Sequence, residues 1–77
     1  MRVVIKSPTE TLTNQVAWLE IQTAAGGMII MQSHAPMVVP LKPNSQLIMM
    51  VGTLRQQYQV IHGIAHIMRE GVLILLG

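Results

Sequence analysis

The sequence has 77 residues, of which 51% are hydrophobic and only 10% are charged, with a net charge of +2 and no cysteine. A chain of this length folds as one small domain, and typical soluble domains carry about 25% charged residues. The composition excludes disulfide scaffolds and thiolate metal sites, and it predicts exposed apolar surface of the kind that meets a partner.

The positive charges do not form the basic stripe that is typical of nucleic-acid binding. Trp18 and Tyr58 are the only aromatic residues, so stacking platforms for bases are also lacking. The five cations are spread along the chain at Arg2, Lys6, Lys42, Arg55 and Arg69. We therefore expect no nucleic-acid partner.

The longest apolar runs, Leu47 to Val51 and Val72 to Leu76, are much shorter than the ~18 to 20 residues of a membrane-spanning helix. The N-terminal residues lack the apolar core and small-residue cleavage pattern of a signal peptide. The sequence thus predicts no membrane span and a cytoplasmic protein.

Apolar runs are separated by Gly, Pro, Asn and Ser about every ten residues, which is the spacing of strands in a sandwich or barrel. We expect an all-β fold, a small antiparallel β-sandwich or barrel of about eight to nine strands, as a single domain over 1–77. The expected strands are Arg2 to Lys6, Val16 to Thr23, Met28 to Met31, Met37 to Leu41, Gln46 to Val51, Leu54 to Ile61, Ile64 to Met68 and Val72 to Leu76.

Turn residues mark the connections between these strands. The sequence Ala24-Ala25-Gly26-Gly27 predicts a turn, because glycine adopts positive φ without steric cost. Residues 32–36 are expected to form a loop, residues 42–45 a turn, and Arg69-Glu70-Gly71 a tight hairpin turn.

Methionine is unusually frequent, with seven residues in the chain. Six of them lie in or beside the expected strands, so most are expected in the core. Successive strand residues point to opposite faces, so Met49 and Met50 predict apolar groups on both sides of one sheet.

No constellation predicts catalysis. The three carboxylates, Glu10, Glu20 and Glu70, belong to different segments. His62 and His66 have the spacing of a helical zinc site, but four residues along a strand span about 13 Å, too far to hold one ion. We expect neither an enzyme nor a metal or cofactor site.

Lys42 raises an alternative function, because an exposed lysine in a turn of a small β domain is typical of biotinyl or lipoyl carrier domains. Pro43 stands where such domains have an apolar residue beside the lysine. An ordinary solvated turn lysine is the simpler interpretation.

The order of several motifs resembles one family. Gly26 and a short apolar strand are followed by His34-Ala35-Pro36 and then by Leu41-Lys42-Pro43, with Ser7-Pro8 after the first strand and His62-Gly63 before a final hairpin. Over nearly its whole length the chain resembles the N-terminal β-sandwich domain of the epsilon subunit of rotary ATP synthases, called delta in mitochondria.

This resemblance implies a noncatalytic part of the central stalk, held between the gamma subunit and the membrane rotor ring. It implies a gamma-facing side that includes Lys6, His34 and Val39. The loop of Gly26, Gly27 and Met28 would face the rotor ring. The protein would be peripheral to the membrane through the complex, in a proton- or sodium-translocating synthase.

The sequence also departs from the family pattern. The rotor-facing loop has Gly27 and Ile29 where the family commonly has an acidic residue and then glycine, and Gln32-Ser33 replaces Pro-Gly before the histidine. The family's C-terminal helical hairpin, which inhibits ATP hydrolysis, has no counterpart in 1–77. The altered rotor-facing loop suggests an alternative, a free-standing protein-interaction module that has lost the synthase role.

Overall fold

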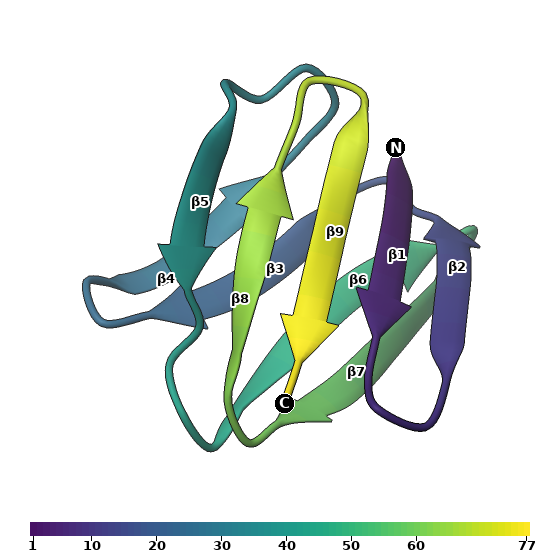
Figure 1. Cartoon of the computed structure of the whole chain (residues 1–77). Helices are drawn as coiled ribbons and strands as arrows, with labels where there is room; N and C mark the ends of the chain where they lie inside the picture. The colour runs from purple at the N-terminus through teal and green to yellow at the C-terminus, as the bar shows by residue number, and fades with distance from the viewer.

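The computed structural model describes residues 1–77, which form nine strands and no helix (Figure 1). It contains no helix that could span a membrane. The strands are β1 (Arg2–Lys6), β2 (Thr11–Gln15), β3 (Leu19–Thr23), β4 (Gly26–Ile30), β5 (Met37–Pro40), β6 (Ser45–Val51), β7 (Leu54–Val60), β8 (Gly63–Ile67) and β9 (Gly71–Leu76).

The strands form two sheets that pack face to face. Sheet A has five strands in the order β2-β1-β9-β8-β5, and sheet B has four in the order β4-β3-β6-β7 (Figure 1). Every neighbouring pair is antiparallel except β1 and β9. The prediction of an all-β sandwich of eight to nine strands is confirmed.

The first and last strands lie side by side and run parallel, with Val3 opposite Val72 and Ile5 opposite Ile74. A parallel pair cannot be joined by a short hairpin. All the intervening strands form the connection, so the two ends of the chain lie at opposite ends of adjacent strands (Figure 1).

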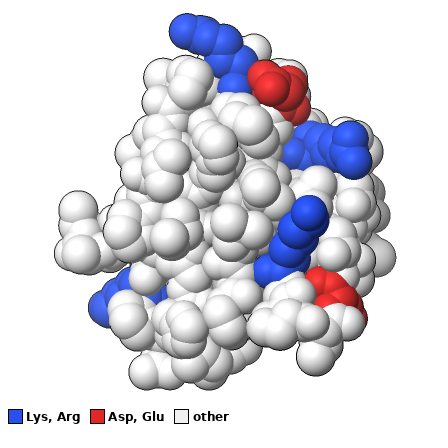
Figure 2. Space-filling model, viewed as in Figure 1, with Lys and Arg blue, Asp and Glu red and all other residues white.

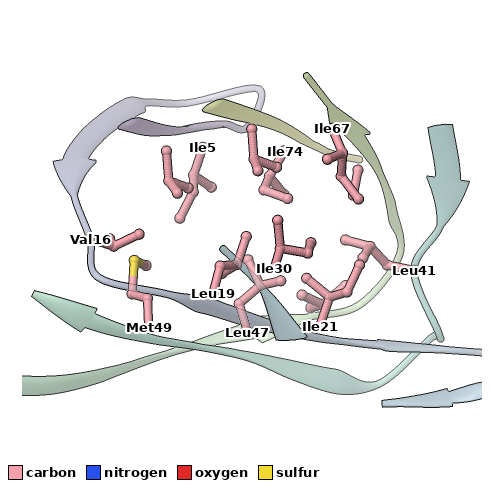
Figure 3. Packing of buried hydrophobic residues seen from close by; sticks show 14 residues of the cluster. Ile5, Val16, Leu19, Ile21, Ile30, Leu41, Leu47, Met49, Ile67 and Ile74 are labelled. Atoms are coloured by element: carbon pink, nitrogen blue, oxygen red, sulfur yellow. The ribbon is translucent and has the colours of Figure 1, made fainter. Parts of the chain in front are cut away.

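The core lies between the sheets and follows from the alternation along each strand (Figure 3). Sheet A contributes Val3, Ile5, Ala65, Ile67, Val72 and Ile74. Sheet B contributes Leu19, Ile21, Ile30, Leu47, Met49 and Val60. Val16 and Leu41, just outside the strands, complete the cluster.

Strand β2 was not predicted, because its sequence, Thr-Leu-Thr-Asn-Gln, lacks an apolar run. As an edge strand it packs Leu12 against the core, and Asn14 Nδ2 lies 4.0 Å from the sulfur of the buried Met49. Strand β3 also starts later than predicted, at Leu19. Before it, the chain bends, and Ala17 N–H donates to Met50 O at 2.8 Å.

The expectation that most methionines are in the core is wrong. Only Met49 belongs to the buried cluster, whereas Met31 is 58% and Met37 38% exposed. Both exposed residues flank the loop at residues 32–36, beside β4 and β5, which are edge strands. An edge strand has neighbours on one side only, so its ends are poorly covered.

Candidate docking surfaces

Lys6 and Val39 both belong to sheet A but point to opposite sides of it. Lys6 ends β1 and is exposed on the outer face. Val39 pairs with the buried Ala65 and packs, half-buried, against the core. Its neighbour Val38 points outward and is 62% exposed.

His34 lies in the loop between β4 and β5 and is half-buried. The loop is tied to the β8–β9 turn because Ser33 N–H donates to Arg69 O at 3.2 Å, and Ser33 itself has φ 65°. His34 Nδ1 is 2.7 Å from Ala35 O. A carbonyl only accepts, so this hydrogen bond requires a proton on Nδ1; in the neutral ring, Nε2 is then left as an acceptor.

The three residues expected on the gamma-facing side do not form one cluster. From Lys6 on β1, the register runs across the sheet to Leu75 on β9, Ile64 on β8 and Pro40 on β5. Val39 is the neighbour of Pro40 on β5. Three inter-strand steps of ~4.8 Å place β1 about 14 Å from β5. The His34 loop turns at the other end of the sheet from Lys6.

Gly26, Gly27 and Met28 lie together at the start of β4, in the hairpin with β3. The hairpin turn is braced by Thr23, which is only 8% exposed. Its hydroxyl donates to Gly26 O at 2.8 Å and accepts from Ala25 N–H at 3.2 Å. Gly26 has φ 115°, a conformation that favours glycine.

The outer face of sheet A is largely apolar. Across the sheet, Val38, His66, Leu73 and Val4 form one row, and Pro40, Ile64, Leu75 and Lys6 form the next. We call Val4, Val38, Pro40, Ile64, Leu73 and Leu75 the apolar face. Figure 2 shows this side as an uncharged expanse over β5, β8 and β9, with charged groups toward β1 and the margins.

The outer face of sheet B is mixed, with polar side chains predominating. Its exposed or half-buried polar residues are Glu20, Gln22, Gln46, Arg55, Gln57 and Gln59, interspersed with Ile29, Ile48 and Met50. Glu20 accepts a hydrogen bond from Gln22 Nε2 at 3.3 Å. The two faces of the sandwich therefore differ in chemistry.

Two shallow grooves border the apolar face. One, of about 360 Å³, is lined by Arg2, Val4, Lys6, Met68, Glu70, Gly71, Val72 and Leu73. The other, of about 460 Å³, is lined by Pro40, Leu41, His62, Gly63, Ile64, Leu75, Leu76 and Gly77. Both are open surface depressions that continue the face.

The structure does not bring the carboxylates together. Glu10 lies between β1 and β2, Glu20 in β3, and Glu70 between β8 and β9. No group of three potential metal ligands is formed. Lys42 is exposed. Its backbone N–H donates to Gln22 O at 2.8 Å, so the turn that contains Lys42 is fixed against β3.

The sequence of residues 1–76 matches the family model described as "ATP synthase, Delta/Epsilon chain, beta-sandwich domain". This chain belongs to that family. The family resemblance noted from the His34-Ala35-Pro36 and Leu41-Lys42-Pro43 motifs is confirmed over almost the whole chain. A comparison with curated protein sequences finds no match.

Solved structures with the same fold include chains from mitochondrial ATP synthases. A chain of the Euglena gracilis enzyme, solved as OSCP/F1/c-ring, superposes with TM-score 0.86 at 27% identity, covering 96% of this chain and 48% of that one. A chain of the Tetrahymena thermophila central stalk/c-ring has TM-score 0.83 at 12% identity, covering 99% and 62%. This delta/epsilon domain thus spans about half to three fifths of those chains.

Sequence reasoning missed most of the exposed residues of this delta/epsilon domain's apolar face. The sequence places Ile64 and Leu75 in strands. Whether their side chains face water depends on which face of their sheet the other sheet covers. The sequence places Arg2 in the first strand and among the scattered cations, but it does not predict that Arg2 lines the same groove as Lys6. The available signal was alternation: Val3 and Ile5 are buried, so Arg2, Val4 and Lys6 must share the other face.

Proposed function

We propose that this domain is a noncatalytic central-stalk subunit of a rotary ATP synthase that docks on the gamma subunit and the rotor ring. The observation that carries the proposal is an exposed apolar face on a domain of the delta/epsilon family. Soluble monomers seldom expose contiguous apolar patches larger than a few hundred Å², and larger patches usually mark interaction sites.

The gamma-facing side in this proposal includes Lys6, the His34 loop and the β5 segment of Val39, where the side chain of Val39 points to the core and that of Val38 is exposed. His34 presents an imidazole on a loop that Pro36 stiffens and that Ser33 ties to the β8–β9 turn. Apolar burial supplies affinity there, at ~25 cal/mol per Å², and the polar groups fix orientation.

The rotor-ring contact is the β3–β4 hairpin with Gly26, Gly27 and Met28. Its tip, Ala24-Ala25, carries only methyl groups, so another backbone can approach closely. The Thr23 hydrogen bonds hold the tip in one conformation, which lowers the entropy lost on docking. The subunit would thus be peripheral to the membrane through its complex.

The test is co-expression of the full chain with the gamma subunit of the same organism, followed by size-exclusion chromatography and a binding isotherm. We expect a stoichiometric complex. Val38→Ser should raise the dissociation rate, because Val38 is 62% exposed on the apolar face. Ile29→Ser is the matched control, because Ile29 is 56% exposed on sheet B.

If the chain is a monodisperse monomer that does not bind the gamma subunit, the proposal is contradicted and the free-standing interaction module is favoured. Equal effects of Val38→Ser and Ile29→Ser would refute the assignment of the apolar face. For the rotor side, a bulky Gly27→Trp change should reduce retention on a detergent-solubilised rotor ring while gamma binding is kept.

A further inference from the structure

The cations beside the apolar face have no acceptor within the chain. Lys6 is exposed at the end of β1, and Arg2 is exposed at its start. Neither side chain takes part in any of the side-chain hydrogen bonds of the structure. Their charges are therefore available to a partner.

These two cations lie on the same side of one strand, with Val4 between them. Four residues of strand separate their Cα atoms by about 13 Å. The groove that they share with Val4 and Leu73 contains one carboxylate, Glu70, which lies at the β8–β9 turn. The groove thus has an apolar floor and an excess of positive charge.

The groove is continuous with the apolar face. Leu73 pairs with both Val4 and His66, and Leu75 pairs with both Lys6 and Ile64. In the row that starts at Pro40, the outward side chains are apolar across β5, β8 and β9, and the row ends at Lys6 on β1, about 14 Å from β5. The row that starts at Val38 includes His66 on β8 and ends at Val4. No acidic side chain lies in these two rows.

We infer that the protein surface covering the apolar face is itself apolar and carries carboxylates along one margin, opposite Lys6 and Arg2. This inference rests on the proposed docking to gamma and names the chemistry that gamma must present. Covering Lys6 and Arg2 without a counter-charge would remove water from two cations at a large free-energy cost. Carboxylates there restore the lost interactions and fix the orientation of the partner.

The experiment measures association and dissociation rates of the full chain with the gamma subunit between low and high salt. Lys6→Glu should slow association about 10-fold at low salt, and Arg2→Gln should slow it less, because charges at the margin act mainly on the association rate. Both variants should flatten its salt dependence. A gamma variant with the facing carboxylate changed to lysine should restore binding to Lys6→Glu.

Arg55→Glu is the matched control, because Arg55 is an exposed cation on β7 in sheet B. It makes the same change in net charge as Lys6→Glu and should alter the association rate by less than about 2-fold. Circular dichroism and thermal unfolding of each isolated variant establish that it is folded.

The outcomes separate the two ideas. If the wild-type chain does not bind gamma, the proposed function fails. If it binds, but Lys6→Glu and Arg2→Gln behave like Arg55→Glu, docking stands and the inferred acidic margin is overturned. Faster association of Lys6→Glu would mean a basic partner and would also overturn it.

Discussion

Lys6 and Leu75 are register partners in the parallel pair of β1 and β9, and both project from the outer face of sheet A. The residues just before them on each strand, Ile5 and Ile74, are also register partners, and both side chains are buried in the core. One step along each strand therefore separates the core from the proposed docking surface. This arrangement allows the two to be tested independently.

Truncation of Ile74 should strongly destabilise the domain. Ile74 is fully buried between the sheets, so Ile74→Ala should cost about 2–5 kcal/mol in free energy of unfolding, and Ile74→Val about 0.5–1.5 kcal/mol. Urea unfolding measures both. The adjacent Leu75→Ala removes a side chain that is 44% exposed and should change stability by less than about 0.5 kcal/mol. Equal losses at the two positions would contradict the assigned faces.

Thr23 should hold the β3–β4 hairpin turn through its hydroxyl. Thr23→Val keeps the shape but removes the bonds to Gly26 O and from Ala25 N–H, which should cost about 1–3 kcal/mol. Hydrogen exchange at the Ala25 amide should accelerate. Thr13→Val, at an exposed position of β2, is the control and should leave that amide unchanged. Unaltered hydrogen-exchange protection of the Ala25 amide in Thr23→Val would contradict the role of the Thr23 hydroxyl in holding the turn.

Gly71 should be required for the close approach of β9 to β1. A Cβ atom at position 71 would collide with the backbone carbonyl oxygen of Arg2, which cannot rotate away. Gly71→Ala should therefore lower stability by about 1–3 kcal/mol. Each kcal/mol corresponds to about 4–8 °C in Tm for a domain of this size.

Gly27→Ala is the comparison for that change. A Cβ atom there would meet only the Gln22 side-chain amide at 3.2 Å, and that flexible side chain can move. Its Tm should stay within a few degrees of wild type. A similar Tm loss for both glycines would show that backbone crowding at Arg2 is not the cause.

Methionine oxidation should follow burial. In the isolated chain, peroxide should oxidise Met31 and Met37 first, because they are 58% and 38% exposed, and Met49 last, because it is fully buried. Peptide mass spectrometry gives the order. In denaturant the three rates should converge, and early oxidation of Met49 in the folded chain would contradict the core assignment.

The sequence by itself determined the fold class, because period-two alternation and turn residues every ten positions leave a β-sandwich as the economical solution. It also determined the strand at Arg2–Lys6 and the family, through His34-Ala35-Pro36 and the motifs around it. These features are local, so short-range patterns carry them.

Only the tertiary structure decided how strands distant in sequence pair. The placement of β1 beside β9 depends on contacts between the two ends of the chain. The exposure of Ile64 and Leu75 depends on which face of sheet A is covered by sheet B. A strand's own pattern separates its two faces. Long-range packing decides which face of a strand is covered and by which element. The same packing places Lys6 beside an apolar surface.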